Sequence, residues 1–214
     1  MQLKAREISQ KFGNNLVLSE FNCSVEPGSC TVVTGPNGSG KSTLLRILAG
    51  LTRPTRGNVQ IIDDEGKVLP VREARNYLGL VSPDIQLYGE LTATENMLVF
   101  SQMRGEQKAS EYFLELFQNF DLLEYAHALV GSFSSGMKQK LKIIFALSHN
   151  PFILLLDEPT TNLDEVGVKA VEEVVKRYKE ENRSLVLTTN DAREAQKFGD
   201  KVIRLGEACS GSGG

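Results

Sequence analysis

One glycine-rich segment limits what this chain can fold into more than any other feature. Between a short β-branched run, Cys30–Val33, and a stretch with helical spacing, the sequence fits the pattern G-x-x-x-x-G-K-[ST] in full. The residues of this segment are Gly35, Pro36, Asn37, Gly38, Ser39, Gly40, Lys41 and Ser42, and Thr43 follows. A loop of this kind turns successive backbone N–H groups, and the positive end of the next helix, toward one anion. The segment therefore predicts a phosphate-binding loop for a nucleoside triphosphate.

Two side chains of this loop have distinct expected roles. Lys41 is expected to reach the β- and γ-phosphates, and the hydroxyl of Ser42 is expected to bind Mg²⁺. The helix that follows should end at Gly50, a common helix stop. The pattern by itself leaves open which kind of nucleoside triphosphatase this is.

A second feature is the apolar run Phe152–Leu156, which ends in two carboxylates, Asp157 and Glu158. An acidic pair after a strand is usually a simple turn, but a phosphate-binding loop requires such a partner. Asp157 is therefore expected to hold Mg²⁺, directly or through water. Glu158 is expected to polarise the attacking water as a general base.

Composition narrows the class of protein. The chain has 214 residues, 41% of them hydrophobic, and a net charge of −3, which argues against a nucleic-acid partner. No run approaches the ~18 apolar residues that span a bilayer, and Met1–Glu7 carries charges where a signal peptide would be apolar. We therefore expect a cytosolic chain that needs a partner for any role at a membrane. Cys23, Cys30 and Cys209 show no C-x-x-C spacing and are expected to be buried free thiols.

The order of the predicted elements gives the fold class. In the first strand Leu3, Ala5, Glu7 and Ser9 alternate with their neighbours, and a hairpin is expected over 57–70. Helical patterns follow until about residue 150, and strands then alternate with helices. We predict an α/β protein with a P-loop nucleoside triphosphatase core, whose mixed, mainly parallel sheet has flanking helices. An N-terminal antiparallel β part and a helical insertion complete the prediction.

A single domain, 1–214, is expected. Its predicted parts are the β part and P-loop core (1–87), the helical subdomain (88–150), the rest of the core (151–208) and a flexible tail (209–214).

With these elements in place, nearly the whole chain resembles the ATP-binding cassette family. The family has a signature close to L-S-G-G-Q, and Phe133–Met137 reads F-S-S-G-M here. Ser134 and Gly136 match the strongest positions, whereas Ser135 is a variant. A Ser/Gly loop at a helix start is by itself an ordinary cap, but it is also an anion-binding end. The resemblance implies that Ser134, Ser135 and Gly136 contact the γ-phosphate held by an opposite subunit.

The resemblance assigns two further site positions. Asp164, at the end of Pro159–Asp164, looks like part of the family's D-loop, which crosses the dimer interface. Phe12 falls where the family places an aromatic ring to stack on adenine, a contact that needs only a π-face. A core aromatic is the alternative for Phe12. Leu91–Asn96 resembles the segment that opens the family's helical subdomain.

Two departures from the family's pattern concern catalysis. Pro83 stands where the family usually has a Gln that touches Mg²⁺ and the membrane partner, and Gln86 lies three residues later. Asn190 stands where the family has a His that contacts the γ-phosphate. Asparagine can hydrogen-bond a phosphate oxygen but carries no positive charge. We therefore expect ATP binding with slow but real hydrolysis, in which Lys41, Glu158 and Asn190 take part.

The resemblance implies an ATP-binding, ATP-hydrolysing subunit of an ABC transporter, similar to exporter-type cassettes, with ATP and Mg²⁺ as cofactors. Its implied partners are a second cassette domain, with a homodimer expected, and separate transmembrane permease subunits. These permeases would hold it at the inner face of the cell membrane. Two alternatives stay open: a soluble cassette ATPase for assembly or repair, and an ATP-dependent regulator with little hydrolysis.

Overall fold

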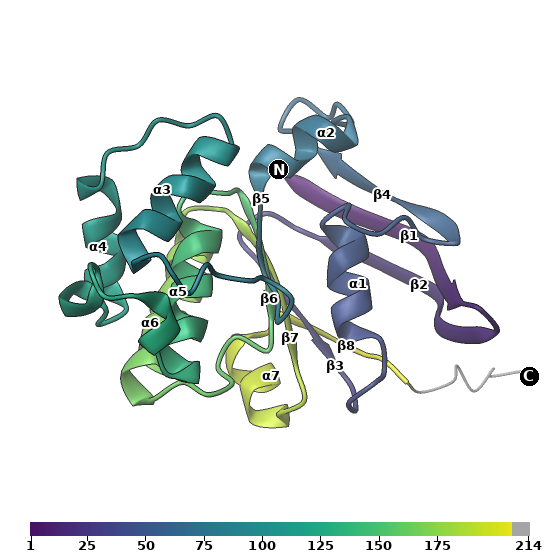
Figure 1. Cartoon of the computed structure of the whole chain (residues 1–214). Helices are drawn as coiled ribbons and strands as arrows, with labels where there is room; N and C mark the ends of the chain where they lie inside the picture. Colours follow the sequence, from purple (N-terminus) through teal and green to yellow (C-terminus); the bar gives the residue numbers. More distant parts are fainter. Residues whose placement is uncertain (207–214) are drawn as a thin grey trace, which may run out of the picture.

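In the computed structural model, which describes residues 1–206, a parallel sheet lies between a group of helices and an antiparallel sheet (Figure 1). The antiparallel sheet contains β1 (Gln2–Phe12), β2 (Asn15–Val25) and β4 (Arg56–Ile62), in the order β2-β1-β4. The parallel sheet has the order β5-β6-β7-β3-β8. Its strands are β3 (Cys30–Thr34), β5 (Leu78–Val81), β6 (Ile153–Asp157), β7 (Ser184–Thr189) and β8 (Lys201–Arg204). This arrangement confirms the predicted α/β core with an antiparallel part in front.

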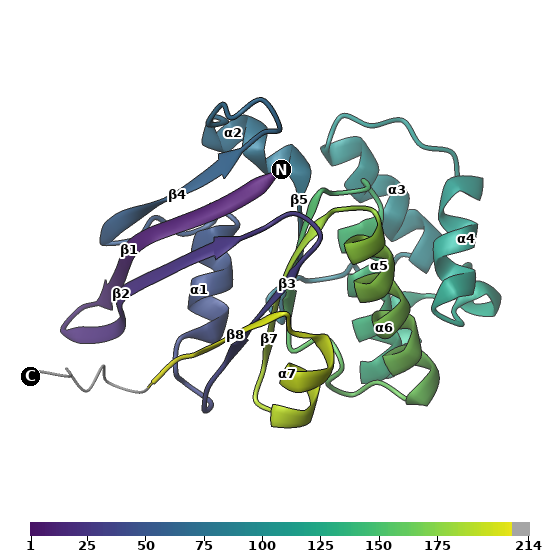
Figure 2. The ribbon, with the colours of Figure 1, turned by 180° about the vertical axis from the view of Figure 1, so that it is seen from behind.

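Seven helices are present among the described residues. They are α1 (Lys41–Leu48), α2 (Val71–Ala74), α3 (Ala93–Met103), α4 (Glu111–Asn119), α5 (Ser135–Leu147), α6 (Glu165–Glu180) and α7 (Ala192–Phe198). Short 3-10 turns occur at η1 (Arg75–Tyr77), η2 (Leu123–Tyr125) and η3 (Val130–Ser132). The helices α3, α4 and α5 are inserted between β5 and β6, and together with α6 they lie on the side away from the antiparallel sheet (Figure 2).

The parallel sheet is buried on both faces, which produces two hydrophobic cores. Successive side chains of a strand point to opposite faces, so Leu154 and Leu156 of β6 pack with residues of α5 and α6. On the other face, Ile153 and Leu155 pack with α1 and with the antiparallel sheet. All five residues of β6 are buried, as expected for a central parallel strand. The second of these cores contains α1 and so fixes the helix that follows the phosphate loop against the parallel sheet.

The first strand departs from a plain alternation. Leu3 and Ala5 are buried, and the next buried residue is Ile8, because the strand is irregular between Ala5 and Ile8. Glu7 has a left-handed backbone conformation, with φ of 52°, and its N–H donates to Asn22 Oδ1 at 2.9 Å. This bulge moves Glu7 away from the core and sets Ile8 into it.

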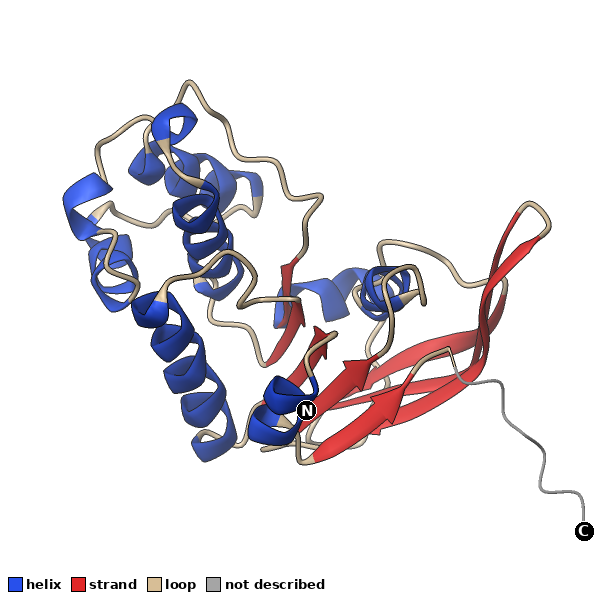
Figure 3. Cartoon of the chain, turned by 90° about the horizontal axis from the view of Figure 1, so that it is seen from below, coloured by secondary structure: helices blue, strands red, loops and turns tan. Residues whose placement is uncertain are grey.

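The hairpin expected over 57–70 forms only in part. The main partner of β4 is β1, with pairs from Gln2–Ile62 to Ser9–Arg56. The returning segment contributes a single bridge, between Ile62 and Val68, whose hydrogen bonds run from Asp63 N to Lys67 O and from Leu69 N to Ile61 O. Figure 3 shows β1, β2 and β4 as a long twisted ribbon that extends away from the helices. Ile61 of β4 is buried in the core that also contains α1.

The predictions about membrane-spanning segments and about the cysteines can be compared with the structure over residues 1–206. Of the helices formed by residues 1–206, none combines the length and the apolar character that a membrane crossing requires. Cys23 and Cys30 are buried free thiols, as predicted, and burial raises their pKa to about 11 and about 12. Cys209 and the tail 209–214 lie outside the described residues.

Candidate nucleotide-binding site

The phosphate loop runs from the end of β3 into the first turn of α1. Gly40 precedes the helix with φ of 95°, and a Cβ there would lie 2.9 Å from Val17 Cγ1, so the position requires glycine on two grounds. Lys41 is buried although it is charged. Its ammonium donates to the carbonyls of Gly35 at 2.8 Å and Pro36 at 3.2 Å, which holds the side chain folded back over the loop. A cation so placed faces any anion that the loop binds.

The carboxylate of Asp157 lies at the end of β6, directly beside β7. The parallel register pairs Asp157 with Thr188, and Thr188 Oγ1 donates to Asp157 Oδ1 at 2.6 Å. The second oxygen, Oδ2, is buried and has no hydrogen-bond partner among residues 1–206. A buried carboxylate oxygen without a donor is costly in an apolar interior but suits a divalent cation. Asp157 therefore fits the expected Mg²⁺, together with the exposed Ser42 across the same pocket.

Glu158 has an unusual backbone conformation that directs its carboxylate toward Lys41. Its φ is 45°, a value that residues other than glycine rarely adopt. Its N–H donates to both the carbonyl and the hydroxyl of Thr188, each at 3.1 Å, which stabilises this turn. Glu158 Oε1 lies 3.5 Å from Lys41 Nζ, and the side chain keeps a third of its surface exposed. Strained backbone of this kind often occurs where a side chain must be aimed at a reacting group.

These groups line one pocket of about 410 Å³. Its lining combines the apolar Phe12 and Val17 with the loop residues Asn37, Gly38 and Gly40 to Thr43 and with Pro83, Asp157 and Glu158. The volume is within the range of small-molecule sites, about 300–1,000 Å³. Phe12, at the end of β1, is 54% exposed, so it is a surface aromatic beside the loop and not a core residue.

Asn190 lies beside the phosphate loop, but on another side of it. Its Nδ2 donates to Asn37 Oδ1 at 3.4 Å. Asn190 lines a separate hollow of about 730 Å³ together with Gly35 and Pro36, whereas the pocket with Phe12 does not include it. The sequence therefore placed Asn190 next to the correct loop, and the structure sets it at the edge of the site.

The segment Ser134–Gly136 does not line the pocket with Phe12, but Ser135 lines a neighbouring pocket that shares Pro83, Asp157 and Glu158 with it. Ser134 caps α5, because its hydroxyl accepts from the N–H of Met137 at 3.2 Å. Ser134 and Ser135 are exposed. Gly136 packs so closely that a Cβ would lie 2.6 Å from the carbonyl oxygen of Asn162. This loop is thus an exposed helix start held against the segment that follows Glu158.

Asp164 performs structural tasks within its own chain. Its carboxylate caps α6 by accepting from Gly167 N at 2.8 Å, and it forms an ion pair of 3.1 Å with the buried ammonium of Lys140. The hydrogen bond from Gly167, with the help of Lys140, lowers the pKa of Asp164. The carboxyl is largely exposed, so it also remains accessible from outside.

Sequence reasoning missed two groups that organise the site. Thr188 links Asp157 to Glu158, as described above. Glu194 of α7 accepts from Thr189 Oγ1 at 2.6 Å and from the hydroxyl of Thr160, so it joins the end of β7 to the segment after Glu158. The signal for Thr188 was present, because a polar residue at the end of a buried strand beside Asp157 needs a partner.

Comparison with known proteins agrees with this geometry. The family model described as ABC transporter matches residues 18–161. The Nod factor export ATP-binding protein I of Burkholderia lata is 34% identical over 206 residues, which cover 94% of this chain and 67% of that protein. The lantibiotic transport ATP-binding protein SrtF of Streptococcus pyogenes is 31% identical over 200 residues, which cover 94% of this chain and 85% of that protein.

Solved structures give the same result. The ATP-binding subunit of an ABC transporter superposes with a TM-score of 0.84 at 27% identity, over 96% of this chain and 86% of that one. A bacterial ABC transporter cassette solved as a dimer superposes with a TM-score of 0.82 at 29% identity, over 95% of this chain and 94% of that one. The fold and the loop define a P-loop nucleoside triphosphatase, and the chain belongs to the ABC transporter family. Within that family it is an ATP-binding subunit.

Proposed function

We propose that this chain binds ATP with Mg²⁺ in the pocket between Phe12 and Glu158, hydrolyses it, and transmits the resulting closure to separate membrane subunits. The observation that carries the proposal is the meeting of Lys41, Asp157 and Glu158 in one pocket, where Glu158 lies 3.5 Å from Lys41. These residues come from α1, from the end of β6 and from the residue after β6. If the Lys41–Glu158 ion pair had only a structural role, the buried Oδ2 of Asp157 in the same pocket would still lack a hydrogen-bond donor.

Each part of the nucleotide has a partner in this proposal. Phe12 stacks on the base, and the loop N–H groups with Lys41 bind the β- and γ-phosphates. Ser42 and Asp157 hold the cation, which neutralises charge on the phosphate oxygens. The orphaned oxygen of Asp157 supports this assignment.

Hydrolysis requires a base and a donor near the γ-phosphate. Glu158 supplies the base, because its carboxylate is held at the pocket wall and remains partly exposed to water. Asn190 supplies a neutral donor beside Asn37. A neutral amide stabilises the charge that develops in the transition state less than a cationic histidine would, so turnover should be slow.

We further propose that two copies of the chain complete each other's sites. The exposed helix start at Ser134–Gly136 does not line the pocket with Phe12 of its own chain. Across a dimer it would meet the γ-phosphate bound by the partner, and the exposed carboxyl of Asp164 would lie at the junction. The related cassette that was solved as a dimer, also in a post-hydrolysis state with ADP and Pi, supports this proposal.

Transport is the proposed use of the ATP. The relatives serve Nod factor export and lantibiotic transport by name, which supports permease subunits as partners and a place at the inner face of the cell membrane. Co-purification with a multi-span chain separates this role from that of a soluble assembly ATPase.

The binding site is tested with Lys41→Ala and, as a matched control, Lys176→Ala on the exposed face of α6. Affinity for a fluorescent ATP analogue with Mg²⁺ should fall at least about tenfold in Lys41→Ala, because a charge-assisted contact to phosphate is lost. The control should bind like the wild type. Equal affinity of all three proteins would contradict the assignment.

A further inference from the structure

The segment 82–86 forms a wall of the candidate site. Pro83 lines the pocket with Phe12, and it also lines a neighbouring pocket of about 540 Å³ that contains Ser135, Asp157 and Glu158. Gln86 lines only the second pocket. Because Pro83 contributes no polar side chain, its own effect beside Glu158 depends on where its backbone is held.

Lys142 of α5 holds that backbone. Its ammonium donates to the carbonyl of Pro83 at 2.9 Å and approaches the carbonyl of Ser82 at 3.5 Å. The side chain lines the pocket of about 540 Å³ and is half-buried. Partial burial lowers the pKa of Lys142, whereas the nearby carboxylate of Asp84 acts in the opposite direction. Placing an ammonium in such a site is unfavourable unless its donors are used.

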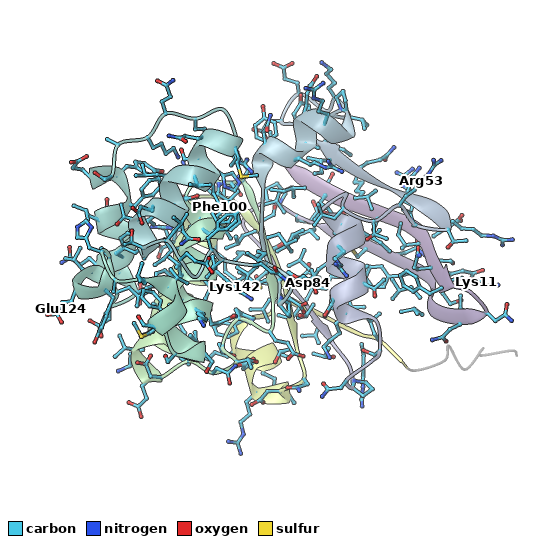
Figure 4. All side chains as sticks on the ribbon, viewed as in Figure 1. Lys11, Arg53, Asp84, Phe100, Glu124 and Lys142 are labelled. Atoms are coloured by element: carbon cyan, nitrogen blue, oxygen red, sulfur yellow. The ribbon has the colours of Figure 1, made fainter. Side chains whose placement is uncertain are left out.

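The same segment is also tied to the phosphate-loop helix. Asp84 forms an ion pair of 3.1 Å with Arg46 of α1. Asp84 and Lys142 lie between α1 and the helical group in Figure 4. The Arg46–Asp84 pair is about half exposed on both sides, and ion pairs so exposed to water contribute little. The charged donor of Lys142, which is less exposed, is therefore the stronger of the two attachments.

The helix α5 reaches two more parts of the site. Gln139 Nε2 donates to the carbonyl of Pro159 at 3.3 Å, and Lys140 pairs with Asp164. Polar side chains of one helix therefore hold the segment after Glu158, the start of α6 and the segment 82–86. These contacts connect α5, whose start carries Ser134 and Ser135, to the wall of its own nucleotide pocket.

We propose that Lys142 is a positioning residue for ATP hydrolysis: by holding the Pro83 carbonyl it fixes the wall beside Glu158, a task for which position 83 offers no polar side chain. This proposal rests on the proposed function of the pocket. It predicts that the loss of the Lys142 ammonium lowers the rate of the chemical step and leaves the hold on the triphosphate intact.

The test compares the full-length wild type with Lys142→Met, Lys142→Arg and the exposed α6 control Lys176→Met. Steady-state ATPase assays over a range of ATP concentrations should give a kcat about tenfold lower for Lys142→Met, with the KM for ATP within about twofold. Lys142→Arg, which keeps a charged donor, should recover most of the rate, and the control should match the wild type. Amide hydrogen exchange over 82–86 should be faster in Lys142→Met alone, which shows the loss of the attachment independently of turnover.

Three outcomes overturn the proposal. The first is a kcat of Lys142→Met near that of the wild type, and the second is an equal loss in the Met and Arg variants. The third is unchanged hydrogen exchange over 82–86, which would show that the attachment does not hold the segment. If the wild type has no turnover that Glu158→Gln abolishes, the proposed function itself fails. Faster exchange in Lys142→Met would then show that the attachment exists without a catalytic consequence, which contradicts the positioning role.

Discussion

The hydroxyl of Thr188 donates to Asp157 Oδ1 at 2.6 Å and accepts from the backbone N–H of Glu158 at 3.1 Å. One side chain of β7 therefore orients both acidic residues at the end of β6. The parallel register, which sets Asp157 opposite Thr188, makes this double contact possible. The geometry of the proposed cation ligand and that of the proposed base are consequently linked through a single hydroxyl.

Replacing Thr188 with Val keeps the shape of the side chain and removes the hydroxyl. The buried carboxylate of Asp157 then loses its donor, so the free energy of unfolding should fall by about 1–3 kcal/mol. ATPase activity at limiting Mg²⁺ should fall further than activity at saturating Mg²⁺. Thr188→Ser, which retains the hydroxyl, should stay close to the wild type in urea unfolding and in both assays. A Val variant as stable and as active as the Ser variant would contradict the role of the hydroxyl.

Gly136→Ala tests the packing of the exposed helix start against the next segment. Alanine favours helices by up to about 1 kcal/mol over glycine. The new Cβ, however, would lie 2.6 Å from the backbone carbonyl of Asn162, and overpacking of this kind costs about 1–3 kcal/mol. The clash should outweigh the propensity, so thermal unfolding should occur at a lower temperature. The neighbouring change Ser135→Ala, at an exposed position, should alter stability little. A more stable Gly136→Ala would show that the two segments separate freely.

His149, which lies outside the nucleotide pocket, makes the free energy of unfolding depend on pH. Its Nε2 lies 2.9 Å from the carbonyl of Leu78 and must carry the proton, while Nδ1 is buried with no partner in the described part of the chain. Burial, with the nearby charge of Arg104, lowers the pKa of His149 to about 4 from an ordinary value of 6.5. Between these two values the unfolded chain binds more protons, so the free energy of unfolding should fall as pH decreases from 6.5 to 4.

The contribution of His149 over that range should be at most about 3 kcal/mol. Urea unfolding of the wild type and of His149→Gln measures it, at about pH 7, above the range, and at about pH 5.5 and about pH 4.5, within it. Glutamine keeps a donor for Leu78 and does not titrate, so its stability should change less with pH. Parallel curves for the two proteins would contradict the assignment to His149.

Substitutions of Asn190 test whether its side-chain amide takes part in ATP hydrolysis. Asn190→Ala removes the amide beside Asn37 and should lower kcat several-fold, about the effect of one hydrogen bond, with little change in ATP affinity. Asn190→His, which adds a group able to carry charge, should equal or exceed the wild type. An Ala variant with full activity would place Asn190 outside the reaction.

Local patterns predicted the parts of the site that are continuous in sequence. The phosphate loop, the strand that ends in Asp157 and the capped start of α5 each have their signal within a few residues. The contact of Lys142 with Pro83 and that of Arg46 with Asp84 join residues far apart in the chain. No periodicity indicates which charged side chain turns inward, because that choice depends on how the helices pack.

The irregularities of the backbone could not be predicted from the sequence either. The bulge at Glu7 and the left-handed turn at Glu158 occur at residues that have no preference for positive φ. Both are stabilised by partners from other strands, Asn22 and Thr188. The pairing of β4 with β1, which joins residues far apart in the chain, is likewise absent from any local pattern. Where tertiary contacts determine the backbone conformation, sequence patterns predict that a strand forms but not which strand it pairs with.

Steady-state ATPase activity of the wild type beside Glu158→Gln tests the proposed hydrolytic site. Glutamine keeps the size of the side chain but cannot accept a proton, so Mg²⁺-dependent turnover should be measurable in the wild type and absent in the variant. Light scattering should show that the variant, which retains ATP, forms a dimer only when ATP is present. Equal turnover of the two proteins, or none in the wild type, would contradict Glu158 as the base and favour an ATP-dependent regulator with little hydrolysis.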